Sequence, residues 1–306
     1  ASFANAEVFV FKNTTLGQAV GCLLIVCTAV STGCGASHAP AHGVPVAGHA
    51  GAPLHIVSLS ATATESLFAI GAGDRVVAVD DQSNYPAGAP HSKLSSLHPS
   101  AEAVAAYRPD LVVTTGDDSG FVASLHALRI PVLVQPPARS LGEAYAQIEH
   151  LGATTGRLAA ARRILAAMRR RIAALVASVR PVRATSVYHE LSPDSYSASS
   201  DTFIGAVYRL FGLRDIADGA HAVTSGYPQL SREYVLRANP GLIVLADVKC
   251  CAQSARTLTE RPGWKLLRAV RDGAVVAVDD DIASRWGPRT VEFVAAIARV
   301  LRHRGG

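Results

Sequence analysis

The sequence predicts an α/β protein built from two similar lobes, and three observations support this prediction. First, one segment occurs twice, because residues 100–113 and 231–244 carry Ser, Glu, Val, Pro and Leu at the same offsets. Each copy is typical of a short helix that Ser caps and Pro follows, leading into a buried strand. Second, strand patterns flank a helix near the start of the folded part. Third, residues 141–179, between the two copies, contain no strand pattern.

We expect the first lobe over residues 53–138. It begins with a strand, a helix and a second strand in direct succession, and such a βαβ unit makes its strands parallel. Besides the repeated segment, the pattern predicts strands at 55–59, 75–79, 111–114 and 132–134, and helices at 65–70 and 120–128.

A helical connector is expected over residues 139–180. Within it, residues 156–179 place apolar side chains at helical spacing opposite a face of arginines. This pattern is typical of a helix that packs on a core with one side. One long, rigid helix is therefore predicted between the lobes, which would limit their movement. We interpret its arginines, which carry much of the net charge of +5, as a solvated face.

The second lobe is expected over residues 181–306. The pattern predicts strands at 185–189, 242–245 and 275–278, and helices at 202–211, 264–270 and the C-terminal end. The loops after the strands of both lobes carry Tyr, Asp, Arg, Trp and Gln. Open α/β sheets bind ligands beyond the carboxyl ends of their strands, so we expect these loops to face a ligand between the lobes.

Residues 1–33 are predicted to be a signal peptide. The apolar run Leu16–Val30 has about 15 residues, fewer than the roughly 20 that a membrane-spanning helix needs. Small residues directly before Cys34 resemble the lipobox of bacterial lipoprotein precursors, which implies a lipid on Cys34. Residues 34–52 have the composition of a flexible tether. We therefore expect the protein in the cell envelope, lipid-anchored on the outer face of the cytoplasmic membrane.

Cys250 and Cys251 are the only cysteines that remain in the folded part, because Cys22 and Cys27 leave with the signal peptide. An exported protein folds in an oxidising compartment, where adjacent thiols are prone to form a disulfide. We predict a vicinal disulfide first and ligand contact second. A metal site ranks third, because no second Cys or His pair stands nearby at ligand spacing.

The familiar enzyme motifs are absent from the sequence. It contains no dinucleotide-binding glycine fingerprint after the first strand, no phosphate-binding loop, no zinc-protease motif and no serine nucleophile elbow. The basic residues are not interleaved with aromatics and form no known nucleic-acid module. We therefore expect a protein that is not an enzyme, has no metal or cofactor of its own and does not bind nucleic acid.

Several ordered motifs resemble the helical-backbone (class III) substrate-binding proteins of ABC importers. These motifs are residues 58–73, 83–86, 109–113, 199–205, 227–233, 262–264 and 284–289. The resemblance implies two Rossmann-like lobes and a metal chelate as ligand: an iron-siderophore, haem or cobalamin. The cobalamin-binding members look most similar. We expect a monomer that delivers its ligand to a permease dimer. The alternatives are a tetrapyrrole-handling enzyme or chelatase of similar architecture, and a sensor lipoprotein.

The resemblance also implies roles for particular residues. Glu102 and Glu233 match the paired glutamates that the family presents to arginines of the two permease subunits. The alternative is that both only stabilise the positive ends of their helices.

The ligand-binding positions follow from the same resemblance. Tyr85, Tyr196, Tyr227, Asp281 and Arg285 match positions that line the cleft in cobalamin-binding members. Gln82 and His98 stand where those members offer further aromatics. Arg285 is expected to meet an anionic edge of the ligand. Trp286 is placed at the floor or rim of the cleft, where packing is its favoured role.

Overall fold

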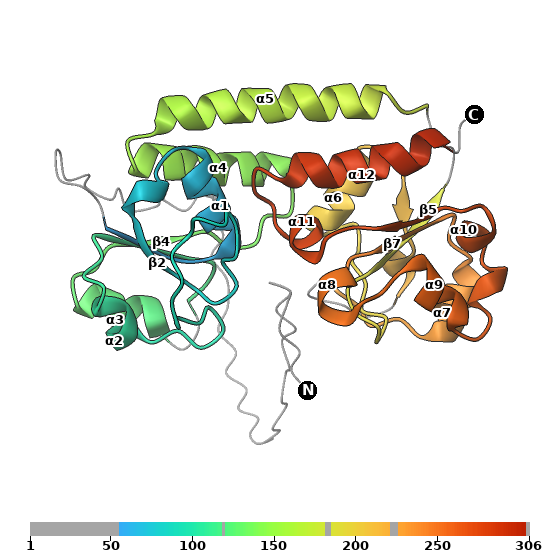
Figure 1. The fold of residues 1–306 in the computed structure, drawn as a ribbon, viewed down its shortest axis with the longest axis horizontal. Coiled ribbons are helices and arrows are strands. Elements are labelled where there is room, and N and C mark those ends of the chain that lie inside the picture. The colour runs from blue at the N-terminus through green and yellow to red at the C-terminus, as the bar shows by residue number, and fades with distance from the viewer. Residues whose placement is uncertain (1–54, 118–119, 181–184, 221–225, 304–306) are drawn as a thin grey trace, which may run out of the picture.

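Each lobe is built on a four-stranded parallel sheet (Figure 1). The computed structural model describes residues 55–117, 120–180, 185–220 and 226–303, so the predicted signal peptide, tether and lipidated Cys34 lie outside the described residues. The first sheet has the order β2-β1-β3-β4. Its strands are β1 (Ile56–Leu59), β2 (Val76–Val79), β3 (Leu111–Thr114) and β4 (Val132–Val134).

The second sheet repeats this order as β6-β5-β7-β8. Its strands are β5 (Ser186–Glu190), β6 (Arg214–Asp215), β7 (Leu242–Leu245) and β8 (Val275–Ala277). The strands that follow the two copies of the repeat, β3 and β7, hold the same place in their sheets, and both are buried throughout. The predicted duplicated α/β architecture is therefore confirmed.

The helices of the first lobe are α1 (Ala61–Ala69), the 3-10 turn η1 (Gly73–Arg75), α2 (Ala101–Ala105) and α3 (Phe121–Ala127). Helix α1 begins four residues before the predicted start at residue 65, because the Ser60 side chain accepts a hydrogen bond from the Ala63 N–H. Seven consecutive residues of α1 are buried, from Ala61 to Leu67. The helix is thus fixed firmly in its lobe.

The connector is a pair of helices, α4 (Leu141–Thr154) and α5 (Leu158–Ala177). Helix α5 is the long helix predicted over residues 156–179, and α4 is an additional helix that ends where Gly156 adopts a φ of +69°. Helix α5 belongs to both cores: Leu165 and Met168 pack in the first lobe, and Ile172 and Leu175 pack in the second. A helix shared by both cores holds the lobes together.

The second lobe contains more short helices than expected. These are α6 (Phe203–Arg209), η3 (Ile216–Gly219), α7 (Arg232–Ala238), α8 (Val248–Cys251), α9 (Ala255–Glu260), η4 (Trp264–Leu266), α10 (Arg268–Arg271), α11 (Asp280–Ser284) and α12 (Thr290–His303). Helix α12 packs along α5 (Figure 1). Within the described ranges, no helix has both the length and the apolar character that a membrane crossing requires.

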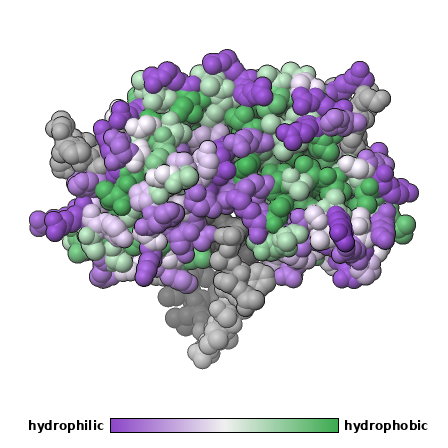
Figure 2. Space-filling view, in the orientation of Figure 1, coloured by the Kyte–Doolittle hydropathy of each residue, from purple (hydrophilic) through white to green (hydrophobic). Residues whose placement is uncertain are grey.

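The surface is polar along the connector and at the junction of the lobes. Arg162, Arg163, Arg169, Arg170 and Arg171 are exposed on α5, as expected of a solvated face. Figure 2 shows hydrophilic residues gathered also in the middle of the face, where the two lobes meet.

Candidate functional site

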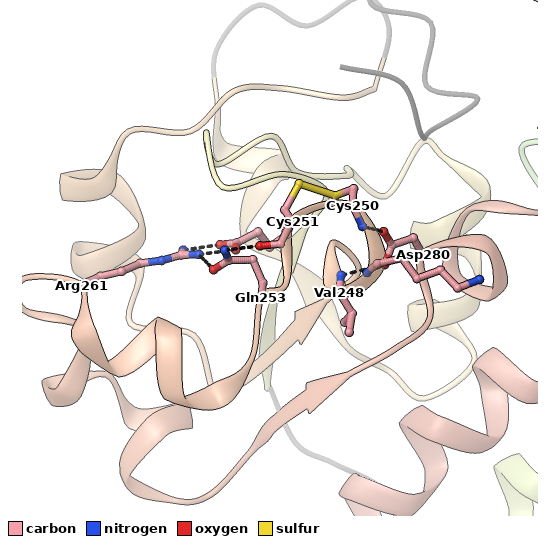
Figure 3. Close-up of a disulfide and its surroundings, with 8 residues drawn as sticks. Val248, Cys250, Cys251, Gln253, Arg261 and Asp280 are labelled. Atoms are coloured by element: carbon pink, nitrogen blue, oxygen red, sulfur yellow. Dashed lines mark hydrogen bonds and ion pairs between the residues drawn. A yellow bond between two sulfur atoms is a disulfide. The ribbon is translucent and has the colours of Figure 1, made fainter. Parts of the chain in front are cut away.

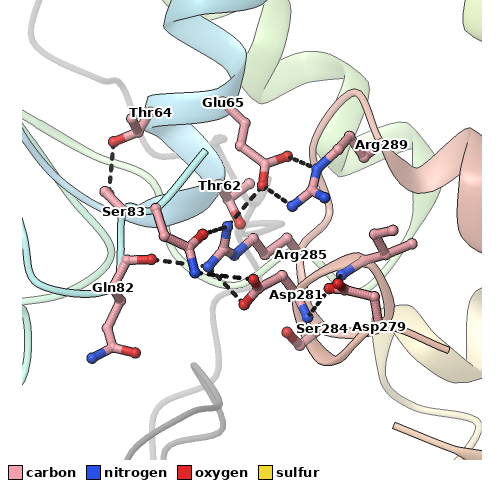
Figure 4. A network of polar contacts seen from close by, with 12 residues as sticks. Thr62, Thr64, Glu65, Gln82, Ser83, Asp279, Asp281, Ser284, Arg285 and Arg289 are labelled. Carbon is pink, nitrogen blue, oxygen red and sulfur yellow. Dashed lines mark hydrogen bonds and ion pairs between the residues drawn. The ribbon is translucent and has the colours of Figure 1, made fainter. Parts of the chain in front are cut away.

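Loops from the carboxyl ends of both sheets meet at the junction of the lobes. The loop after β2 carries Asn84, and α11, which follows β8, carries Asp281. The Asn84 side-chain amide donates a hydrogen bond to Asp281 Oδ2 at 3.0 Å, across a separation of 197 residues (Figure 4).

Arg285 lies buried at the centre of this junction, with 6% of its side chain exposed. Its Nη1 donates to Glu65 Oε1 at 2.8 Å and to Asn84 Oδ1 at 2.9 Å. Its Nη2 donates to the Gln82 carbonyl at 2.9 Å and to Asp281 Oδ1 at 2.8 Å. The guanidinium predicted to meet a ligand is thus engaged by the protein itself, and three of its four acceptors belong to the other lobe.

Arg289 approaches the same carboxylate from a second direction. Its Nη2 donates to Glu65 Oε1 at 2.6 Å and its Nε donates to Glu65 Oε2 at 3.0 Å. The guanidinium carbon of Arg289 also lies 4.1 Å from the ring centroid of Tyr85, a cation–π contact. Tyr85 itself is 45% exposed, so one face of its ring is supported and the residue still reaches the surface.

The junction is balanced in charge. Lys249 Nζ lies 2.8 Å from Asp279 Oδ2 and 2.6 Å from Asp281 Oδ2. Burial alone would raise the pKa of Asp281, but hydrogen bonds from Lys249 and Asn84 and the charge of Arg285 hold it below its usual value. Three cations (Lys249, Arg285, Arg289) therefore face three carboxylates (Glu65, Asp279, Asp281). This network has no surplus charge to attract an anion.

A second polar cluster lies at the carboxyl ends of β5 and β7. Glu190 is fully buried and accepts hydrogen bonds from Arg261 Nη1 and Nη2, both at 2.6 Å. Asp247 is also fully buried, and neither of its carboxylate oxygens accepts a hydrogen bond. Burial, together with the nearby Glu190, raises the pKa of Asp247 to about 8. The raised pKa favours a proton on Asp247, which can then donate a hydrogen bond to Glu190.

Cys250 and Cys251 form a disulfide at the end of α8 (Figure 3). The Asp280 carboxylate accepts hydrogen bonds from the backbone N–H groups of Val248, Lys249 and Cys250 at 2.7, 3.0 and 2.9 Å. These bonds satisfy the free N–H groups at the start of α8. Asp280 thus ties the disulfide turn to the loop after β8.

The other predicted ligand residues lie in different surroundings. Trp286 is 5% exposed, and its indole N–H donates to Gln147 Oε1 of α4 at 2.8 Å, which agrees with packing. Tyr227 is half-buried on the second core, and burial raises its pKa to about 12. The backbone of Tyr196, also half-buried, forms an antiparallel bridge with Gln229. His98 is exposed, and its backbone N–H donates to Ser95 Oγ.

Sequence reasoning missed Glu65, Asn84 and Arg289. Glu65 gave one signal, since it is a charged residue within a helix that is otherwise apolar or small. Arg289 lies four residues after Arg285 and shares its partner. Nothing in the sequence around Glu65 or Arg289 indicates that the residue pairs with the other lobe.

Glu102 and Glu233 hold equivalent positions in the two lobes. Each lies in the first turn of its helix, α2 or α7, and each is exposed. Backbone and Ser100 hydrogen bonds lower the pKa of Glu102, so it is ionised at neutral pH. Figure 1 shows α2 and α7 on the same side of the molecule, the side away from α5.

A cavity of about 250 Å³ lies within the second lobe alone. Its lining is Ser199, Ser200, Asp201, Ala217, Asp218, Ala220 and Pro228. The volume is below the roughly 300 Å³ at which small-molecule pockets begin. Among the residues that the structure describes, no group of three or more His, Cys, Asp or Glu is placed to hold a metal ion.

Comparison with known proteins agrees with the duplicated fold. Residues 56–282 match the family model described as periplasmic binding protein. The chain belongs to the periplasmic binding protein family. This periplasmic binding protein is 30% identical over 261 residues to YvrC of Bacillus subtilis (strain 168), named as an ABC transporter substrate-binding lipoprotein, with 81% of this chain and 80% of the relative covered. It is also 30% identical over 260 residues to a cobalamin-binding protein of Halobacterium salinarum, covering 82% of this chain and 70% of the relative.

Solved structures share the fold of this periplasmic binding protein. The apo haem-binding protein RhuT from Roseiflexus sp. RS-1 superposes with a TM-score of 0.71 at 23% identity, covering 83% of this chain and 100% of that chain. The vitamin B12-binding protein BtuF of Vibrio cholerae gives a TM-score of 0.68 at 23% identity, covering 83% and 98%. These likenesses establish the fold.

Proposed function

We propose that this periplasmic binding protein is the substrate-binding lipoprotein of an ABC importer, which captures a metal chelate between its lobes and delivers it to the permease. The observation that carries the proposal is the pair of exposed glutamates, Glu102 and Glu233, at equivalent positions on one side of a two-lobed molecule. Helix stabilisation explains each glutamate alone, but a permease dimer explains why both lobes present one. The names of the two relatives at 30% identity support the same function.

The proposed ligand lies between the lobes, near the loops at the carboxyl ends of the sheets. Tyr85 and Tyr227 are the main contacts, one from each lobe, because a flat macrocycle or chelate rests on aromatic rings. Gln82, His98, Tyr196 and Asp281 complete the proposed surface. Arg285 and Trp286 shape the site from beneath, since both are buried and hydrogen-bonded to protein.

Cobalamin is the first ligand to test, since a relative that matches most of this chain is named for it. Haem and ferric siderophores are the other candidates. Residues 34–52 would tether the lobes to a lipid on Cys34 at the outer face of the cytoplasmic membrane. Metabolic labelling with palmitate tests the anchor, with label expected on the unchanged chain and absent from Cys34→Ser.

Calorimetric titration of the purified chain with cyanocobalamin, haemin and a ferric hydroxamate siderophore tests the function. We expect saturable binding of one of the three, with the ligand recovered chemically unchanged. Chemical conversion of the bound tetrapyrrole would show an enzyme instead. The absence of binding to all three would contradict the proposed class of ligand.

A further inference from the structure

A buried ionic contact joins the two lobes, with the carboxylate from one lobe and the two guanidinium groups from the other. Glu65 belongs to α1 in the first lobe, and 1% of its side chain is exposed. Arg285 and Arg289, which follow α11 in the second lobe, both donate to its carboxylate (Figure 4). These partners lie 220 and 224 residues from Glu65 in the sequence. The contact is therefore sensitive to how the lobes are placed.

The geometry of this contact permits little adjustment. Arg289 binds both oxygens of Glu65 through two different nitrogens, and such two-point guanidinium–carboxylate pairs fix direction as well as distance. Glu65 cannot follow a moving second lobe, because α1 is buried over seven consecutive residues. Arg285 adds two more first-lobe acceptors, the Asn84 side chain and the Gln82 carbonyl.

The same contact reaches the proposed ligand surface. The guanidinium of Arg289, held by Glu65, lies against the ring of Tyr85. Loss of Glu65 would remove the two-point contact between the lobes and the support beneath this exposed tyrosine.

We infer that Glu65 is a positioning residue that holds the two lobes, through Arg285 and Arg289, at the separation at which both contact the ligand. The site is then formed before the ligand arrives. The effect on ligand binding rests on the proposed function, whereas the effect on lobe separation does not.

Interlobe distances measured on the ligand-free chain test the inference. Nitroxides attached through p-acetylphenylalanine at positions 128 and 266, both exposed leucines, report one position in each lobe without using the cysteines. Double electron–electron resonance should give one narrow distance for the otherwise unchanged chain. Glu65→Gln should give a broader or longer distribution.

Arg261→Gln is the matched control. It breaks a buried two-point arginine–carboxylate pair, with Glu190, that lies within the second lobe alone. It should lower stability and leave the interlobe distance unchanged. If Glu65→Gln does not fold, Arg289→Lys decides the question, because it keeps the charge and loses the two-point geometry.

A folded variant whose distance distribution equals that of the unchanged chain would overturn the inference. Ligand titration then tests the consequence. If the ligand-competent arrangement falls to about one tenth of the population, affinity falls about tenfold. Altered distances without chelate binding by any form of the protein would leave the positioning role standing and would instead contradict the proposed function.

Discussion

Glu190 and Asp247 lie at the carboxyl ends of the neighbouring strands β5 and β7, but of these two carboxylates Arg261 binds Glu190 alone. Neither carboxylate oxygen of Asp247 accepts a hydrogen bond, and the residue is fully buried. Two carboxyl groups, Glu190 and Asp247, thus lie beside one cation, Arg261. A proton on Asp247, hydrogen-bonded to Glu190, removes the second negative charge.

This arrangement predicts that stability falls as pH rises through neutrality. The pKa of Asp247 is about 8 in the folded chain, against 3.8 without the fold, so unfolding releases a proton between these values. Unfolding is therefore favoured as pH rises toward 8. Burial lowers the pKa of His189 from 6.5 to about 3, which has the opposite effect, but only below pH 6.5. The window from pH 6.5 to 8 isolates Asp247 from this histidine.

Urea unfolding at several pH values in this window gives the measurement. The unchanged chain should lose stability as pH rises, and Asp247→Asn should show a flatter profile, because its amide does not ionise. Glu260→Gln, a change at an exposed glutamate of the same lobe, should keep the original slope. Equal slopes for the unchanged chain and Asp247→Asn would show that Asp247 does not hold the proton.

Charge reversal at Glu102 or Glu233 is predicted to abolish uptake and leave ligand affinity within a few fold. In the proposed docking, each variant would place an arginine against a permease arginine, and like charges at an interface cost several kcal/mol. Transport by membranes that contain the cognate permease gives the readout. Glu143→Arg, at an exposed glutamate in the first turn of the Ser-capped connector helix α4, is the matched control and should transport normally. Normal uptake by both Glu102→Arg and Glu233→Arg would leave them only a helix-stabilising role.

Arg285→Ala is predicted to lower the free energy of unfolding, because Arg285 binds protein acceptors. We expect this loss to exceed any loss of ligand-binding free energy. Removal of one partner from a buried ion pair costs about 3–5 kcal/mol, and we expect the lower end because Arg289 still binds Glu65. Urea unfolding of the variant measures this loss. A variant of unchanged stability that has lost ligand affinity would restore the interpretation of Arg285 as the anion-binding residue.

The double variant Cys250→Ser/Cys251→Ser is predicted to fold and to bind the ligand with altered affinity. It should fold because Asp280, through three backbone hydrogen bonds, holds the turn that carries the disulfide. Intact mass after alkylation without reductant should show Cys250 and Cys251 unmodified in exported protein. Two alkylated thiols there would refute the disulfide, and an unchanged affinity of the double variant would remove its functional role.

The fold was predictable where burial is continuous. Strands β3 and β7, which are buried throughout, match their predicted bounds to the residue, because each is a short apolar run between clear helix and turn signals. Helices α8, α9 and α11 were missed because four to six residues leave too little periodicity. Their starts are fixed by a few side-chain hydrogen bonds, such as the two of the Ser254–Thr257 capping box of α9.

The site was predictable only as a set of loops. The carboxyl ends of the strands predicted that loops of the two lobes face each other, and the structure brings Asn84 and Asp281 of these segments into a direct hydrogen bond. The pairing of Glu65 with Arg285 and Arg289 carries no local signal, because it depends on how two lobes pack. For the same reason Arg285 was interpreted as free for a ligand.

The structure of the protein with its bound chelate tests the central claim most directly. We predict a chelate between the lobes, in contact with Tyr85 from the first lobe and Tyr227 from the second, with the Glu65–Arg285 pair intact beneath it. A chelate bound to one lobe alone, for example beside the cavity of Ser200 and Asp218, would contradict the account.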